Sequence, residues 1–274
     1  MKKTLGQKET QLLAYCHMRG TGTVETGDLT GPLRITPKQE RELLSRMARA
    51  GIIAKVRRGL YLIPPRLPLG GVWSPDQGLA INTLMEDHRA RYQVCGPNAF
   101  NYYGFDDQIP IRVYAYNDRL SGERKIGAIE LTLIKVAAER LGSTVEVQTA
   151  SDVKLAYSSR ARTLIDAVYD WSRFDSLPRG YAWIRAELAT GKVEPSELVQ
   201  VAVAYGNQGT IRRIGALLEQ EGVNEKLLRA LESALNPSKS VIAAVPGAPR
   251  RGPFNRRWGV INNERRQQEA TSSD

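Results

Sequence analysis

Residues 36–63, TPKQERELLSRMARAGIIAKVRRGLYLI, carry the clearest structural signals of this chain. Thr36 is a natural helix N-cap, Pro37 fits the first helical position, and Gln39 completes a capping box. Gly51 supplies a stop at the other end. The pattern therefore predicts a helix between Thr36 and Gly51 with one apolar stripe, formed by Leu43, Leu44, Met47 and Ala48.

The opposite side of this predicted helix is polar and basic. Four side chains recur at i, i+4, i+7 and i+11 and two arginines flank them; the six are Lys38, Glu42, Ser45, Arg49, Arg41 and Arg46. A recognition helix in a DNA major groove must present such groups outward. We expect Lys38, Arg41 and Ser45 to read bases, with Glu42 beside them, and Arg46 and Arg49 to contact phosphates.

Two β-prone runs follow within residues 52–63, joined at Arg57-Arg58-Gly59. A hairpin with arginines at its tip, directly after a recognition helix, is placed to reach phosphates or the minor groove. We therefore expect Arg57 and Arg58 to hold phosphates. The alternative is a hairpin whose surface charge has no partner.

The preceding residues complete a helix-turn-helix. Apolar residues at i, i+7, i+8 and i+11 predict a first helix that ends before Gly20 and Gly22; they are Leu5, Leu12, Leu13 and Cys16. A short second helix is predicted over residues 25–29, followed by a turn at Gly31-Pro32. Together with the hairpin, these elements predict a winged helix-turn-helix over residues 1–66.

The charge distribution supports this interpretation. The formal net charge is +10. Residues 1–65 hold 12 Lys or Arg and 5 Asp or Glu, residues 66–235 hold 20 and 21, and residues 236–274 hold 7 and 3. A concentrated basic module is typical of a protein that binds a polyanion. The predicted partner of residues 1–66 is double-stranded DNA.

Composition narrows the remaining possibilities. A chain of 274 residues predicts about two modules. No run approaches the ~20 apolar residues that cross a membrane, and the N-terminus does not resemble a signal peptide. Cys16 and Cys95 lie far apart, which disfavours a disulfide framework or a zinc site and predicts a cytoplasmic protein. Only His17 and His88 are available for histidine chemistry.

The residues after the winged helix predict a mixed α/β domain with a helical bundle over residues 74–235. The expected fold class of the whole chain is therefore α+β. Residues 64–75 form a Pro- and Gly-rich connector. Strands are predicted at 92–95, 111–116, 129–136 and 144–148, and helices at 161–171, 181–188, 196–205, 211–219 and 225–235. Residues 236–274 form a basic tail, expected to be extended or disordered. Its arginines beside Trp258 either contact nucleic acid or are simply solvated.

We expect no catalysis, no metal and no cofactor. A nucleotidyltransferase site needs paired carboxylates on a strand, but the strand at 111–116 is followed by a lone Asp118. A metal-dependent nuclease needs an acidic residue two positions before a lysine on a strand, and neither Glu130 nor Glu146 meets this spacing. No glycine-rich phosphate loop is present in the sequence.

Five blocks of the sequence carry a further signal: RGLY at 58–61, CGPNAF at 95–100 with Gly104, QIP at 108–110, SSRARTLID at 158–166 and IRRIGALLE at 211–219. In this order they resemble the AbiEi family, the antitoxins and regulators of AbiE-type (type IV) toxin–antitoxin systems. The resemblance covers about residues 5–235. It implies that the N-terminal domain binds inverted repeats in its own promoter and represses it. It further implies that the second domain counters a cognate AbiEii-type nucleotidyltransferase toxin.

Two alternatives remain open. The blocks also have a packing interpretation, in which Arg162 and Asp166 pair at i, i+4 and Gly215 permits close helix packing. At the level of function, the alternative is a one-component bacterial transcription regulator whose second domain senses a small ligand. Such a sensor would need an apolar pocket with a few convergent polar groups.

Overall fold

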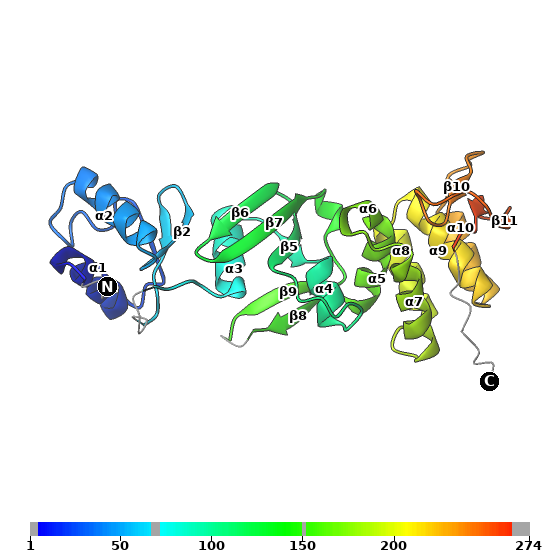
Figure 1. Ribbon diagram of the computed structural model, residues 1–274, viewed down its shortest axis with the longest axis horizontal. Helices are drawn as coiled ribbons and strands as arrows, with labels where there is room; N and C mark the ends of the chain where they lie inside the picture. Colours follow the sequence, from blue (N-terminus) through cyan, green and yellow to red (C-terminus); the bar gives the residue numbers. More distant parts are fainter. Residues whose placement is uncertain (1–4, 67–71, 150–151, 265–274) are drawn as a thin grey trace, which may run out of the picture. The chain divides into compact units, whose positions relative to one another are not determined.

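The computed structural model describes residues 5–66, 72–149 and 152–264 (Figure 1). These residues form a mixed α/β fold with ten α-helices, one short 3-10 helix and three sheets. The chain divides into two compact units. Unit 1 comprises residues 1–94, 110–141 and 146–156, and unit 2 comprises residues 95–109, 142–145 and 157–274.

Unit 1 begins with two helices packed on a small antiparallel sheet of strand order β1-β3-β2. The elements are α1 (Gln7–Arg19), β1 (Thr23–Glu25), α2 (Pro37–Arg49), β2 (Ala54–Arg57) and β3 (Leu60–Leu62). Their buried side chains form one cluster that includes the predicted apolar stripes of both helices, among them Leu12, Leu13, Cys16, Leu43, Leu44 and Met47.

The predicted start of α2 is confirmed. The Thr36 hydroxyl accepts a hydrogen bond from the Gln39 amide at 3.3 Å, and the Gln39 side chain accepts one from the Thr36 amide at 2.9 Å. Gly51 follows the helix in the left-handed region, at φ +72°. Local side chains therefore fix both ends of this helix, as the capping pattern indicates.

The predicted second helix over residues 25–29 is wrong. Strand β1 takes residues 23–25, and residues 26–34 form a series of turns. The cause is the buried side chain of Glu40 on α2, whose carboxylate accepts hydrogen bonds from the amides of Gly27 and Leu29, both at 2.8 Å. The side chain thereby provides an acceptor for two backbone amides of the turns.

A six-stranded sheet follows, with strand order β6-β7-β5-β4-β9-β8. Strands β5 and β7 are parallel, whereas β4–β5 and β6–β7 are antiparallel. Helix α3 (Gln77–Asp87) precedes the sheet, whose strands are β4 (Tyr92–Val94), β5 (Arg112–Asn117), β6 (Gly122–Ile126), β7 (Ile129–Lys135), β8 (Thr144–Gln148) and β9 (Lys154–Ser158). The four predicted strands are confirmed, and β6 and β9 were not predicted.

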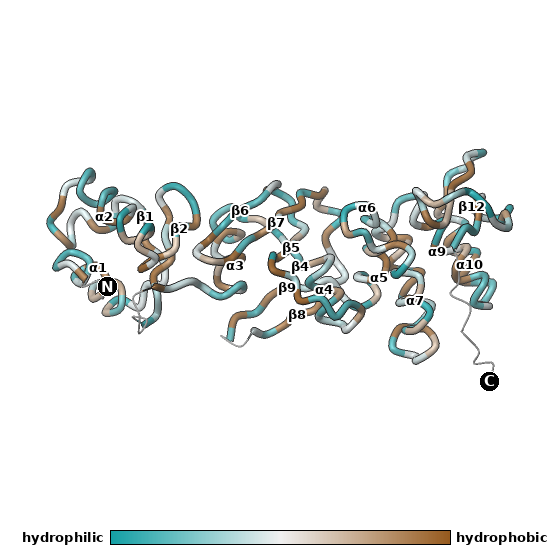
Figure 2. Tube along the Cα trace, in the orientation of Figure 1, coloured by the Kyte–Doolittle hydropathy of each residue, from teal (hydrophilic) through white to brown (hydrophobic). Residues whose placement is uncertain are grey.

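The helical region is also confirmed, and its helices enclose the largest apolar core of unit 2. The helices of this unit are α4 (Pro97–Tyr102), α5 (Arg160–Tyr169), α6 (Trp171–Phe174), α7 (Arg179–Ala189), α8 (Pro195–Tyr205), α9 (Gln208–Gln220) and α10 (Glu225–Ser233). A short 3-10 helix, Ala138–Arg140, belongs to unit 1. Figure 2 shows hydrophobic residues within α5.

The buried pair predicted from spacing is present in α5. Arg162 donates from Nε to both carboxylate oxygens of Asp166, at 2.9 and 3.0 Å, and both side chains are almost completely buried. The Arg162 guanidinium also stacks over the Tyr205 ring, 4.1 Å from its centroid. This block therefore contributes to the core, as the packing interpretation expects.

The expectation of an extended or disordered tail is wrong for residues 236–264. Strands β10 (Ile242–Ala243), β11 (Phe254–Asn255) and β12 (Val260–Ile261) form a small sheet, and Trp258 is buried against Gly215 of α9. Arg257 is not simply solvated, because it pairs with carboxylates of α9 and α10, namely Glu219, Glu225 and Glu232. Residues 265–274 lie outside the described residues.

The predicted domain boundary falls within unit 1. Residues 67–71 of the connector lie outside the described residues. On its far side, the Trp73 amide donates to the Gly51 carbonyl at 2.6 Å, and Val72 lies against Gly51. The division into residues 1–66, 74–235 and 236–274 stays a prediction.

Candidate nucleic-acid interface

Helix α2 presents one face to the core and the other to solvent. All six predicted contact residues on this helix are exposed: Lys38, Arg41, Glu42, Ser45, Arg46 and Arg49. Lys38, Arg41 and Arg49 form no ion pair with any residue that the structure describes. The exposed face thus carries three cations whose charge is not neutralised within the described chain.

Arg46 differs from the other basic residues of α2. Its Nε lies 3.0 Å from a carboxylate oxygen of Glu9 on α1. The hydrogen bond from the Gly6 amide and, to a smaller extent, Arg46 lower the pKa of the Glu9 carboxyl below its ordinary value, whereas burial acts in the opposite direction. Arg46 therefore connects α2 to α1 in addition to facing solvent.

The β2–β3 hairpin turns at Arg58 and Gly59. Gly59 adopts φ +89°, a conformation that suits glycine, and its carbonyl accepts a hydrogen bond from the Thr26 amide at 2.8 Å. Arg58 is exposed and has no ion pair within the described part of the chain. The hairpin therefore holds one uncompensated cation at its tip.

Arg57, the other predicted phosphate contact, has two carboxylate partners. Its guanidinium donates from Nε and Nη2 to the two carboxylate oxygens of Asp87, at 2.6 and 2.5 Å, and from Nη2 to Glu25 at 3.0 Å. Hydrogen bonding to Arg57 holds the pKa of the Asp87 carboxyl below its ordinary value. Spacing along the sequence does not reveal this contact, because 30 residues separate the two side chains.

We expect Asp87→Asn to loosen the hairpin. Because the pKa of Asp87 is lowered in the folded protein, this carboxylate stabilises the fold above its unfolded pKa, and the stabilisation disappears as the pH falls through the folded pKa. Arg57 is partly exposed, so the expected loss is modest, about 1–2 kcal/mol at pH 7. Hydrogen exchange of β2 and β3 measures it. Equal protection of variant and wild type at pH 7 would contradict the prediction.

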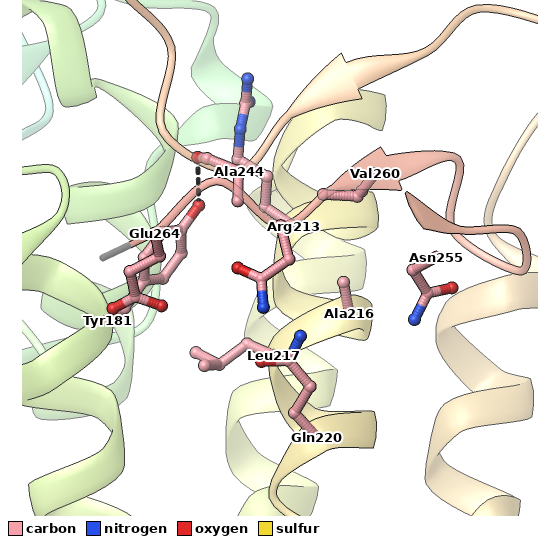
Figure 3. Close-up of a pocket in the computed structure, with 10 residues that line it drawn as sticks. Tyr181, Arg213, Ala216, Leu217, Gln220, Ala244, Asn255, Val260 and Glu264 are labelled. Atoms are coloured by element: carbon pink, nitrogen blue, oxygen red, sulfur yellow. Dashed lines mark hydrogen bonds between the residues drawn. The ribbon is translucent and has the colours of Figure 1, made fainter. Parts of the chain in front are cut away.

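Unit 2 contains a second candidate site, a small pocket with a cavity volume of about 20 Å³ (Figure 3). Tyr181 lies at its wall and donates through its hydroxyl to the Ala244 carbonyl at 2.6 Å. Burial raises the pKa of this tyrosine. Apolar side chains and a few amides or charges share the wall, which also includes Arg213, Ala216, Leu217, Gln220, Asn255, Val260, Asn262 and Glu264.

Two further kinds of site are absent from the residues that the structure describes. No group of three or more His, Cys, Asp or Glu side chains is placed to hold a metal ion. No helix there has the length and apolar character that a membrane crossing requires.

The sequence of this chain has no counterpart among known protein families or curated proteins, whereas its fold does among solved structures. No protein family model matches this chain, and no curated protein matches it in sequence. Among solved structures, the crystal structure of the Rv2827c protein from Mycobacterium tuberculosis is similar, with a TM-score of 0.59 and 14% sequence identity. The match covers 95% of this chain and 93% of that one. At this identity, the likeness shows a shared mixed α/β fold and nothing about activity.

Proposed function

We propose that this chain is a DNA-binding transcription regulator that uses residues 1–66 as a winged helix-turn-helix. The observation that carries the proposal is the exposed face of α2, where Lys38, Arg41 and Arg49 have no ion-pair partner among the described residues. Unpaired cations on one helix face suit the phosphates and base edges of a major groove. The β2–β3 hairpin, with Arg58 at its tip, is the proposed wing.

We further propose that the regulator is an antitoxin of AbiE type. This step rests on the five sequence blocks that resemble the AbiEi family. In this proposal the winged helix represses the chain's own promoter at inverted repeats. Residues 74–235 counter a cognate nucleotidyltransferase toxin encoded beside it.

The ligand-sensing regulator is the second candidate, and the lining of the pocket beside Tyr181 is the observation in its favour. The pocket combines the apolar side chains of Ala216 and Leu217 with amide groups, as a small-molecule site does. Its volume of about 20 Å³ holds no more than a water molecule, so a ligand would have to open it. The two candidates share the same DNA-binding end and differ only in what the rest of the chain does.

If residues 1–66 bind DNA, two kinds of variant should lose DNA affinity in different ways. In Lys38→Ala/Arg41→Ala, binding of the full chain to a duplex from its own promoter should weaken at least about tenfold, since each base contact is worth about 1–3 kcal/mol. Binding to a scrambled duplex should change less. In Arg58→Ala, both duplexes should bind more weakly, and the salt slope should fall by about one unit. Because carboxylates already engage Arg57, replacing it as well should lower the salt slope little further.

Fluorescence anisotropy across salt concentrations measures these effects. Lys226→Ala on α10 is the matched control, because it removes one exposed charge from another part of the chain. If the wild type binds neither duplex, or if the α2 variant binds like the control, the DNA-binding proposal fails.

The same double variant separates the two candidates. Expressed beside the neighbouring nucleotidyltransferase, an antitoxin should lose repression of a promoter reporter and still protect cell growth. If the wild type represses the promoter but gives no protection, the antitoxin step fails and the ligand sensor is favoured. Using the full chain avoids any assumption that a fragment folds alone.

A further inference from the structure

Arg89, just beyond the end of α3, adopts an unusual backbone conformation. Its φ is +49°, in the left-handed region where glycine is the preferred residue. The Arg89 amide donates to the Glu86 carbonyl at 3.0 Å, and the Ala90 amide to the Met85 carbonyl at 2.8 Å. This is a helix C-terminal turn of the kind in which glycine normally stands.

No contact of the Arg89 side chain explains why an arginine stands at this position. It is exposed, and it forms no ion pair or ring contact with any residue that the structure describes. An L-residue other than Asn or Asp is uncommon in this conformation, because its Cβ lies too close to the following carbonyl oxygen. Arg34 is exposed too and has the same φ of +49°, so the conformation alone does not point to a function, and it is the location of Arg89 that singles it out.

The location of Arg89 connects it to the proposed wing. Two residues earlier, Asp87 holds the guanidinium of Arg57 at 2.5 and 2.6 Å, and Arg57 also donates from Nη1 to the carbonyl of Arg58 at 3.0 Å. Two residues of chain span at most about 7 Å. Arg89 thus lies on the segment that is bonded directly to the hairpin next to its tip.

Charge near this segment is mixed. Asp87 and Glu25 are engaged by Arg57. Two exposed arginines, Arg89 and Arg91, follow on the chain, and exposed Glu86 precedes them. None of these three side chains has an ion-pair partner within the described residues. The end of α3 therefore offers cations to an external anion, with Glu86 opposing them.

We propose that the DNA-binding surface extends beyond the winged helix onto the end of α3, where Arg89 contacts a phosphate of the same duplex that the hairpin engages. This inference rests on the proposed function. It adds a contact from residues outside 1–66, so the DNA footprint is longer than the winged helix alone would make.

The test compares Arg89→Gly, Arg89→Lys and Glu86→Gln in the full chain, with the promoter duplex and a scrambled duplex as probes. Each phosphate contact contributes about 0.9 to the slope of log affinity against log salt concentration, which corresponds to about eightfold in affinity at 0.1 M salt relative to 1 M. Arg89→Gly should therefore weaken binding to both duplexes about five- to tenfold and lower the salt slope by about one. Arg89→Lys keeps the charge and should keep most of the affinity.

Two readouts exclude a merely structural effect. Glycine relieves the left-handed backbone, so Arg89→Gly should melt at the wild-type temperature or up to about 4 °C higher while binding more weakly. Glu86→Gln removes an opposing charge, so it should bind both duplexes more tightly, which misfolding cannot produce.

The outcomes separate this inference from the proposed function. If the wild type and Arg58→Ala behave as expected but Arg89→Gly and Glu86→Gln bind like Lys226→Ala, the extension onto α3 is wrong and the winged-helix proposal stands. If the wild type binds no duplex, both are wrong. Weaker binding by Arg89→Gly together with a lower melting temperature and no gain for Glu86→Gln would also overturn the inference.

Discussion

Replacing Glu40 by alanine is expected to destabilise the N-terminal part of unit 1 by about 3–5 kcal/mol. The buried carboxylate accepts hydrogen bonds from the amides of Gly27 and Leu29, and hydrogen bonds to a charged group contribute about 1.5–3 kcal/mol each. Alanine would leave both amides without an acceptor and open a cavity beside α2. The turns at residues 26–34 would then lose their attachment to this helix.

Hydrogen exchange of peptides from α1 and α2 measures the effect, because it reports local opening even in a chain with two units. Glu42→Ala is the matched control: the residue is a glutamate on the same helix, exposed and without an ion pair among the described residues. We expect its effect to stay within about 0.5 kcal/mol. Comparable effects of the two substitutions would show that Glu40 does not hold the turns. We also expect Glu40→Ala to lose promoter binding, since the exposed face of α2 depends on this attachment.

Gly215→Ala should displace the C-terminal segment from α9 and destabilise unit 2 by about 2–3 kcal/mol. A Cβ at this position would overlap the six-membered ring of Trp258, which is fully buried against the helix. Overpacking of a filled core costs about 1–3 kcal/mol, and exposing a tryptophan adds to it. Arg212 holds the same segment, donating to the carbonyls of Trp258, Ser240 and Gly259, all at 2.6 Å.

A red shift of tryptophan fluorescence, together with faster hydrogen exchange over residues 240–263, measures the displacement. Gly209→Ala is the control on the same helix, because its Cβ would meet only the ends of two side chains, Arg213 and Asn207. Alanine favours helix at such a position, so the control should be as stable as the wild type or slightly more so. Unchanged fluorescence in Gly215→Ala would contradict the close packing of Trp258.

Several elements could be predicted from the sequence because their causes are local. The ends of α2 follow from Thr36, Gln39 and Gly51, which act within one or two helical turns. Strand β8 was predicted with its observed bounds, and the helices of unit 2 follow from their apolar periodicity. Strand β6 carried no such signal, because four of its five residues are exposed and it shows no alternation of apolar and polar residues.

For the candidate site, the sequence predicted which residues are exposed but not which of them are paired. The exposed residues of α2 could be listed from helical spacing, because a helix fixes which side chains share a face. The state of each cation could not be deduced from spacing. Nothing in the sequence distinguishes Arg57 from Arg41 or Arg58, yet only Arg57, at the end of strand β2, contacts Asp87 of helix α3. A sequence-local argument has no means to find such a partner.

Local signals in the sequence were sufficient for α2, the β2–β3 hairpin and four of the six strands of the larger sheet, since capping, periodicity and turn residues act between near neighbours. Tertiary structure alone decided three features: the turns at 26–34, the engagement of Arg57 and the packing of the C-terminal segment. Each depends on one buried or paired side chain whose partners lie 11, 30 and 46 residues away, namely Glu40 with Leu29, Arg57 with Asp87 and Arg212 with Trp258. Such contacts form only when the fold brings distant elements together, because burial then requires every charge and amide to find a partner.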